Sequence, residues 1–263
     1  MRLRFLGTGT SFGIPVIGCG CSVCTSADPR DRRSRHAALL EHDAGSMLLI
    51  DTPPELRLQL LAAGVHHIEA VWFTHAHADH IHGIDDLRVF SARMRRPLAA
   101  WADPATAETL RRKFAYIFDE EYRPPEGTTK PEITLHTFHP GRPVDVAGFT
   151  LTPLEVPHGD LAAFGFRVGA LGYITDAKAI PPAARALLDG VRVLVLNALW
   201  YGNPHPTHLN VEEAVETARE IGAERTYLTH LTHRLRHSHL LESLPPGIEP
   251  AYDGLVIDIG PRS

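Results

Sequence analysis

The sequence is poor in cysteine, has no long apolar run and carries no excess of basic residues. Three cysteines among 263 residues are too few for the disulfide framework that stabilises small secreted domains. No stretch approaches the ~20 apolar residues of a membrane-spanning helix. The net charge of -5 does not favour nucleic-acid binding, which draws on clustered Lys and Arg. We therefore expect neither a disulfide-stapled domain nor a membrane span, and nucleic acid is a disfavoured partner.

The overall composition is that of an ordinary globular protein rather than a disordered one. Hydrophobic residues make up 44% of the chain and charged residues 22%. No linker separates two halves, so we expect one domain over residues 1–263. The first residues, Met1–Gly7, look like a strand and lack the apolar stretch of a signal peptide, which predicts a cytoplasmic protein.

The pattern of apolar residues predicts alternating strands and helices. Strands are expected at 3–6, 37–41, 47–50, 71–73, 191–196, 226–228 and 255–259, and several more between 133 and 174. Helices are expected from Pro53-Pro54 to Gly64 and at 84–94, 104–114, 183–188 and 211–221. Residues 118–131, rich in Pro, Glu and Thr, predict a surface loop. The pattern indicates an α/β fold with two packed sheets and helices outside.

The most informative segment is Thr74-His75-Ala76-His77-Ala78-Asp79-His80, directly after the predicted strand 71–73. On an extended backbone His75 and His77 point to one face. A turn then lets Asp79 and His80 project toward the same point. Imidazoles with a carboxylate suit Zn²⁺, Mn²⁺ or Fe, so the segment predicts a metal site.

This His-x-His-x-Asp-His arrangement resembles the signature of the metallo-β-lactamase superfamily. The resemblance implies an αβ/βα four-layer sandwich with a dinuclear metal site at the edge of the two sheets. It also implies three further ligands in the order histidine, aspartate, histidine. Candidates that each follow a strand-like run are His158, Asp176 and His230.

The three cysteines lie together in Gly18-Cys19-Gly20-Cys21-Ser22-Val23-Cys24. Spacings of two and three residues allow three thiolates to converge on one cation, and a closed structural zinc site needs a fourth ligand. We expect His233 to supply it, because it lies three residues after His230 on the same turn. His237 and His239 are the alternatives.

Further segments resemble one branch of the superfamily, the PhnP-type phosphodiesterases, which hydrolyse phosphoribosyl 1,2-cyclic phosphate during phosphonate breakdown. This resemblance also implies a homodimer. The segments are Phe5-Leu6-Gly7-Thr8-Gly9-Thr10-Ser11, the cysteine triplet, Leu49-Ile50-Asp51-Thr52, residues 80–88, His205-Pro206-Thr207-His208-Leu209 and Tyr252-Asp253-Gly254-Leu255.

The resemblance assigns a role to each candidate residue. Two Mn or Zn ions would be held by two ligand sets, and a hydroxide between them would attack a small phosphodiester such as phosphoribosyl 1,2-cyclic phosphate or a 2′,3′-cyclic nucleotide. Asp79 and His208 are the expected catalytic residues, His208 as the acid that protonates the leaving alkoxide. The ligand sets are His75, His77 and His158 for one metal, and Asp79, His80 and His230 for the other, with Asp176 bridging.

Several alternatives stay open at this point. Asp85 and Arg88 either order the site or form a structural ion pair. His205 and His208 are otherwise plain loop residues before a helix that Asn210 caps. A tRNA 3′-processing endonuclease shares the signature, and a non-catalytic carrier in cofactor biosynthesis shares the fold.

Overall fold

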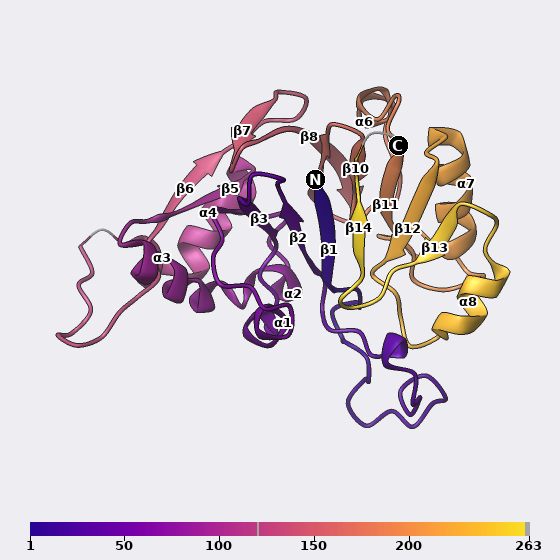
Figure 1. Ribbon diagram of the computed structural model, residues 1–263, viewed down its shortest axis with the longest axis horizontal. Helices are drawn as coiled ribbons and strands as arrows, with labels where there is room; N and C mark the ends of the chain where they lie inside the picture. Colours follow the sequence, from indigo (N-terminus) through magenta and orange to yellow (C-terminus); the bar gives the residue numbers. More distant parts are fainter. Residues whose placement is uncertain (120, 261–263) are drawn as a thin grey trace.

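Two seven-stranded sheets form the centre of the computed structural model, which describes residues 1–119 and 121–260 (Figure 1). The first sheet has the strand order β14-β1-β2-β3-β4-β5-β6, so the last strand of the chain pairs antiparallel with the first. Its strands are β1 (Arg2–Gly7), β2 (Ala37–Glu41), β3 (Met47–Ile50), β4 (Ala70–Trp72), β5 (Leu98–Ala102), β6 (Ile133–Thr137) and β14 (Val256–Asp258).

The second sheet has the order β13-β12-β11-β10-β9-β8-β7. Strands β10 to β13 are parallel to their neighbours in this group, whereas β7, β8 and β9 pair antiparallel. Its strands are β7 (Val144–Val146), β8 (Phe149–His158), β9 (Leu161–Val168), β10 (Leu171–Tyr173), β11 (Val193–Asn197), β12 (Arg225–Thr229) and β13 (Ile248–Pro250).

The helices cover the outer faces of the two sheets. Leu60 and Phe90 pack with Leu49 on the outside of the first sheet, and Ala214 packs with Leu196 on the outside of the second. The helices are α1 (Leu56–Ala62), α2 (Ala78–Ile81), α3 (Arg88–Met94), α4 (Pro104–Lys113), α5 (Ala115–Phe118), α6 (Pro182–Leu187), α7 (Val211–Ile221) and α8 (His237–Ser243), with 3₁₀ turns η1 (Pro29–Asp31) and η2 (Ile84–Leu87).

The inner faces of the sheets bury a common apolar core that includes Phe5, Trp72, Phe166, Tyr173 and Val195. These residues come from both halves of the chain, and the order of layers is helix, sheet, sheet, helix. The predicted αβ/βα four-layer sandwich is therefore confirmed.

Most predicted elements occur close to their expected bounds, and five were missed. The strand β5 is one of them, because Leu98-Ala99-Ala100-Trp101-Ala102 contains three alanines, which have low strand propensity. The others are the short elements α2, α5, α8 and β13. The predicted helix 84–94 is divided into the 3₁₀ turn η2 and the helix α3.

Residues 119 and 121–132 contain no helix or strand, in agreement with the predicted loop; position 120 lies outside the described residues. Among the helices of the described part, none is long and apolar enough to cross a membrane. Strand β4 of the first sheet and strands β8, β10 and β12 of the second end toward one edge of the sandwich, where residues at or just after their ends form the site.

Candidate metal centre

The first half of the chain brings four side chains to this edge. His75 and His77 follow β4 in extended backbone, and His77 is the residue that precedes α2. The single turn of α2 then carries Asp79 and His80. His75, Asp79 and His80 are buried, whereas His77 is exposed.

The second half contributes three residues from the ends of its strands. His158 ends β8, Asp176 follows β10 and His230 directly follows β12. Asp176 and His230 both take the left-handed backbone conformation, with φ of 55° and 57°. Such backbone is rare for residues other than glycine, and here it turns both side chains back toward the sheet edge.

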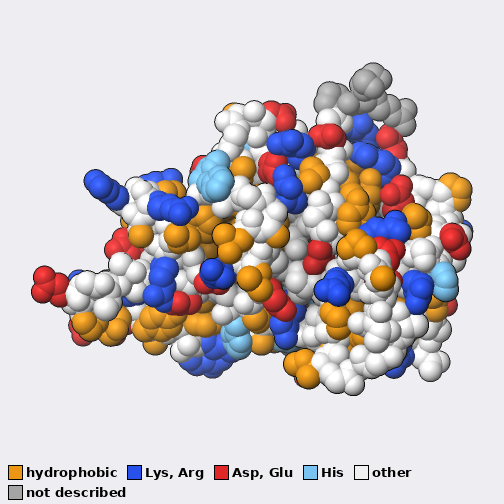
Figure 2. Space-filling view, turned by 60° about the horizontal axis from the view of Figure 1, so that its bottom comes forward, with side chains coloured by type: hydrophobic (Ala, Val, Ile, Leu, Met, Phe, Trp, Pro, Cys, Tyr) orange, Lys and Arg blue, Asp and Glu red, His pale blue; other side chains and the backbone are white. Residues whose placement is uncertain are grey.

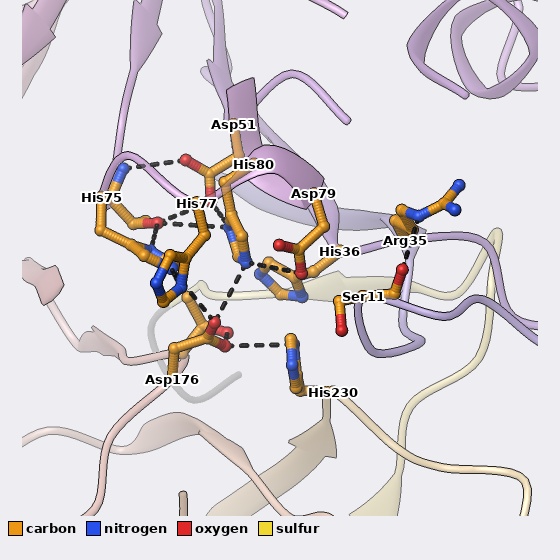
Figure 3. Close-up of polar contacts among 12 residues, drawn as sticks. Ser11, Arg35, His36, Asp51, His75, His77, Asp79, His80, Asp176 and His230 are labelled. Atoms are coloured by element: carbon orange, nitrogen blue, oxygen red, sulfur yellow. Dashed lines mark hydrogen bonds and ion pairs between the residues drawn. The ribbon is translucent and has the colours of Figure 1, made fainter. Parts of the chain in front are cut away.

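The side chains converge on the carboxylate of Asp176 (Figure 3). Its Oδ2 lies 3.1 Å from His80 Nε2 and 3.4 Å from His75 Nε2. Its Oδ1 lies 3.1 Å from His230 Nδ1. Asp79 approaches from the other side, with Oδ2 3.4 Å from His80 Nε2. The carboxylate of Asp176 thus lies within 4 Å of ring nitrogens from five histidines of the centre, whereas Asp79 contacts His80 alone among them.

His75, His77 and His158 form a second cluster at the more exposed side of the centre. The Nδ1 atom of His77 is 3.0 Å from His75 Nε2 and 3.1 Å from His158 Nε2. One ligand atom from each of the three residues lies within 4.8 Å of the others. This is the set that the sequence assigned to the first metal.

Three ring nitrogens of the centre are buried without a hydrogen-bond partner among the described residues: Nε2 of His80, Nε2 of His208 and Nδ1 of His230. Burying a ring nitrogen without a hydrogen-bond partner costs free energy, so such atoms in a folded protein need an explanation. These nitrogens face carboxylate oxygens, and both kinds of atom are ligands for divalent cations such as Zn²⁺ and Mn²⁺. The donor set therefore fits divalent metal ions.

The charges of the centre favour a cation. Burial opposes ionisation of Asp176, but His230 and His80 hold its pKa well below its usual range. Burial disfavours a charged His80, yet the carboxylates of Asp176, Asp79 and Asp51 raise the pKa of His80 well above its ordinary value. Burial lowers the pKa of His230 to about 4. A metal ion supplies the positive charge that these carboxylates favour, without a proton on the ring.

Asp51 holds His80 in place, a role that the sequence did not reveal. Its Oδ2 accepts a hydrogen bond from His80 Nδ1 at 2.7 Å, and both its oxygens accept from Thr74. Because Nδ1 of His80 donates to Asp51, Nε2 would keep its lone pair for a metal ion held between it and Asp176. The segment 49–52 carried the family resemblance, but its spacing did not point to His80.

His36 was also missed, and it lies beneath the centre. It is fully buried, and its ring centroid is 5.7 Å from that of His80 and 6.1 Å from that of His230. Its nitrogens bond to the hydroxyl of Tyr173 at 2.6 Å and to that of Thr229 at 3.2 Å. Burial lowers the pKa of His36 to about 3, so a neutral ring packs against two metal-ligand candidates.

His208 lies beside the centre rather than on the outside of its loop. Its Nε2 is 3.8 Å from Asp176 Oδ2, and its ring stacks on that of His230 at 4.9 Å. The Thr207 hydroxyl lies 2.8 Å from His208 Nδ1, and the Thr207 carbonyl accepts from His158 Nδ1 at 3.0 Å. Thr207 therefore orients both a ligand candidate and the candidate acid.

Asp85 and Arg88 pair with each other, and Asp85 also accepts a hydrogen bond from Tyr116 at 2.6 Å. Arg88 further donates to the carbonyls of Asp85 and Thr129. Of the two roles that the sequence left open, this arrangement corresponds to the structural ion pair.

The three cysteines surround one nitrogen of His233. Their Sγ atoms lie 3.3 Å (Cys19), 3.7 Å (Cys21) and 3.6 Å (Cys24) from His233 Nδ1. A tetrahedral zinc site separates a thiolate sulfur from an imidazole nitrogen by ~3.5 Å. The four side chains therefore fit one zinc ion without rearrangement.

The alternatives for the fourth partner lie elsewhere. His237 packs its ring against Tyr252, and its backbone N–H donates to Asp31. His239 is exposed on α8. Among the thiols, the Cys24 backbone N–H lowers the pKa of Cys21 to about 6, whereas burial raises that of Cys24 to about 11. All three cysteines are free of disulfides.

The sequence of this chain is similar to those of several known proteins. The profile of the family described as "Beta-lactamase superfamily domain" matches residues 47–231, which include the candidate ligands from His75 to His230. An octanoyltransferase of Porphyromonas gingivalis is 40% identical over 97% of this chain, but the chain spans only 51% of that relative's length. A ribonuclease Z of Bradyrhizobium sp. is 30% identical over 64% of this chain and 58% of its own length.

A solved structure covers the whole fold. It is described as a new diphosphatase from the PhnP family, is 37% identical in sequence, and superposes with a TM-score of 0.89 over 98% of each chain.

Proposed function

The chain belongs to the β-lactamase superfamily, in its PhnP-type branch, and on that premise we propose that it is a metal-dependent phosphodiesterase acting on a small cyclic diester. Phosphoribosyl 1,2-cyclic phosphate and 2′,3′-cyclic nucleotides are the candidate substrates. The observation that carries the proposal is the convergence of five histidines and two aspartates at one sheet edge, where buried ring nitrogens of His80 and His230 have no hydrogen-bond partner among the described residues.

Two divalent cations would be held by the ligand sets described above, with Asp176 shared between them. Bound there, such cations activate water near neutral pH and neutralise charge on a phosphoryl group. Asp51 and the Thr207 carbonyl fix the rings of His80 and His158, so that the nitrogens facing the centre are unprotonated. We propose Mn or Zn as the catalytic metals and zinc for the separate cysteine site.

His208 would protonate the leaving alkoxide. Its Nε2 is buried and faces the centre without a hydrogen-bond partner, so it is free to bond to a substrate oxygen. Its Nδ1 is held by the Thr207 hydroxyl, which keeps Nε2 aimed at the same point. A positioned acid of this kind accelerates departure of a poor leaving group by roughly 10²-fold or more.

Processing of tRNA 3′ ends is the competing activity, because it too is phosphodiester hydrolysis and because relatives named ribonuclease Z match the chain. RNA binding draws on clustered basic residues. On the face shown in Figure 2, Lys and Arg alternate with Asp and Glu rather than gathering in one stretch. We therefore favour a small substrate, and we expect a homodimer of the kind that the resemblance implies.

The experiment is hydrolysis of bis-p-nitrophenyl phosphate, 2′,3′-cyclic AMP and phosphoribosyl 1,2-cyclic phosphate by protein loaded with Mn²⁺ or Zn²⁺. We expect turnover of the cyclic diesters and its loss in His77→Ala, because His77 joins the first ligand set. His139→Ala changes an exposed histidine outside the site and is the matched control.

Full activity in His77→Ala contradicts the proposed mechanism. Cleavage of a precursor tRNA in preference to the cyclic diesters supports the nuclease instead. A metal-loaded protein that is inert toward every phosphodiester supports a non-catalytic carrier.

A further inference from the structure

The glycine-rich turn after β1, residues 8–12, is paired with the strand end that carries His230. Gly9 forms a parallel bridge with Leu231, the residue directly after His230. The Leu231 N–H donates to the Thr8 carbonyl at 2.8 Å. The turn is therefore fixed at the edge of the sandwich where the metal-ligand candidates meet, although it supplies none of them.

Close backbone packing holds this turn against the segment that precedes β2. The Gly9 N–H donates to the Ser34 carbonyl at 2.8 Å, and a Cβ on Gly9 would lie 2.7 Å from the Arg33 carbonyl oxygen. Only glycine allows the two backbones to approach so closely. Further along the turn, the Ser11 carbonyl accepts a hydrogen bond from Arg35 Nε at 2.7 Å. The backbone of Ser11 is thus held in one position.

The side chain of Ser11 is directed toward the metal centre. In Figure 3 it points away from Arg35 and toward the space between Asp79 and His230. Ser11 is exposed, so a substrate can reach it. Within the described residues its hydroxyl makes no hydrogen bond, in contrast to that of Thr207, which lies against a histidine ring. A hydroxyl that can both donate and accept therefore faces the centre.

The chemistry of a phosphodiester indicates what this hydroxyl would bind. The negative charge of the diester lies on its two non-bridging oxygens, those bonded to phosphorus alone. The leaving oxygen already has a partner in His208, the proposed acid. We propose that the Ser11 hydroxyl donates a hydrogen bond to one non-bridging phosphoryl oxygen of the substrate, the one on the side of Asp79 and His230. This inference rests on the proposed phosphodiesterase activity and adds a substrate-binding residue to it.

The test uses the cyclic diester that the wild-type protein cleaves fastest, 2′,3′-cyclic AMP or phosphoribosyl 1,2-cyclic phosphate, and the two diastereomers of its phosphorothioate. In each diastereomer sulfur, a weak hydrogen-bond acceptor, replaces a different non-bridging oxygen. We expect Ser11→Ala to lower kcat/KM for the oxygen substrate by about tenfold or more, because a hydrogen bond to a charged acceptor is lost.

The two diastereomers should respond differently to the same substitution. Ser11→Ala should lower kcat/KM by a similar factor for the diastereomer that keeps oxygen at the position facing Ser11. It should leave kcat/KM nearly unchanged for the other, in which sulfur has already weakened the bond. Comparing the variant with wild type on each substrate, with Mn²⁺ throughout, cancels the effect of sulfur on the metal.

Ser22→Ala is the matched control. Ser22 is exposed, and its carbonyl likewise accepts a hydrogen bond from an arginine, Arg236, at 2.9 Å. This variant should leave all three kcat/KM values as in the wild type. Ser11→Thr retains a hydroxyl and should retain most of the rate. Thermal unfolding of each variant confirms that it is folded.

Equal losses on both diastereomers overturn the inference, because they indicate a general effect on the site rather than a bond to one oxygen. An unchanged kcat/KM for the oxygen substrate in Ser11→Ala likewise overturns it. Both results leave the phosphodiesterase proposal standing. Wild-type protein that cleaves no cyclic diester contradicts the phosphodiesterase proposal itself, and the inference falls with it.

Discussion

Asp51, Asp176 and His230 each have a left-handed backbone, with φ of 61°, 55° and 57°. A residue other than glycine is held there only when its surroundings compensate, at a cost of about 1 kcal/mol or more. Each of the three has its side chain in the metal centre or bonded to a residue of it. The strain is thus concentrated where side chains must turn back toward one point.

Asp51→Asn tests whether the Asp51 carboxylate holds His80 in the orientation that metal binding needs. Asparagine tolerates the left-handed conformation and keeps the shape, but it removes the charge that accepts from His80 Nδ1. We expect affinity for one of the two catalytic metals to fall by about 10- to 100-fold, as measured by calorimetric titration of metal-free protein with Zn²⁺. Asp145→Asn, on the exposed strand β7, is the control; equal affinities in the two variants would contradict the role.

Thr207→Val tests the orientation of His208. Valine keeps the branched shape and removes the hydroxyl that lies 2.8 Å from His208 Nδ1. We expect kcat for 2′,3′-cyclic AMP to fall about tenfold or more, with a much smaller loss for bis-p-nitrophenyl phosphate, whose leaving group needs little protonation. Thr207→Ser retains the hydroxyl and should retain the rate. Equal losses on both substrates would rule out a role in proton delivery.

At the scale of helices and strands, the predicted bounds were most accurate where the apolar residues recur with a clear period. Residues 37–41, 47–50 and 211–221 have the predicted bounds, and Asn210 caps α7 through a reciprocal bond pair with Glu213. The strand β5 was missed because burial between β4 and β6, rather than propensity, makes its alanines extended.

The site was predictable to the extent that its residues cluster in sequence. Segment 74–80 indicated metal chemistry by itself, and the family resemblance then supplied His158, Asp176 and His230. Asp51 and His36 could not be found in this way, because strand pairing, not sequence spacing, brings them to the centre.

The cysteine loop, residues 8–36 between β1 and β2, contains no strand and only the short 3₁₀ turn η1. We expect metal analysis of the wild type to give more than two metals per chain, and Cys21→Ser to lose one of them. Because zinc binding contributes folding free energy, the thermal midpoint should fall by roughly 5 °C or more, with a smaller effect on kcat. Ser22→Ala alters the neighbouring side chain only and is the control. Unchanged metal content would argue against a third site.

At the scale of the whole molecule, we propose that residues 1–263 fold as one domain, because strands from both halves share one core. A buried network beneath the cysteine loop joins them further. Arg33 is fully buried, pairs with Asp31 and donates to the carbonyls of Thr232 and Leu235. The backbone N–H of His237 completes the network by donating to Asp31.

The buried ring of His237 makes stability depend on pH. Burial lowers the pKa of His237 to about 4, so between about pH 6.5 and pH 4 the unfolded chain binds a proton that the folded chain does not. The free energy of unfolding should therefore fall as the pH falls through this range, by at most about 1.4 kcal/mol per pH unit from this residue. Urea unfolding from pH 7 to pH 4 measures it. His237→Phe should give a shallower slope, and an unchanged slope would contradict the assignment.

The pairing of β14 with β1 has a consequence for synthesis on the ribosome. Strand β1 has β2 on one side, but its other edge has no partner until residues 256–258 have been translated. Asp253, which accepts hydrogen bonds from Thr8 and Ser34, is made equally late. A nascent chain halted before residue 253 therefore lacks both the partner of β1 on this edge and the hydrogen bonds that residues 8 and 34 donate to Asp253, so its amino-terminal sheet is incomplete.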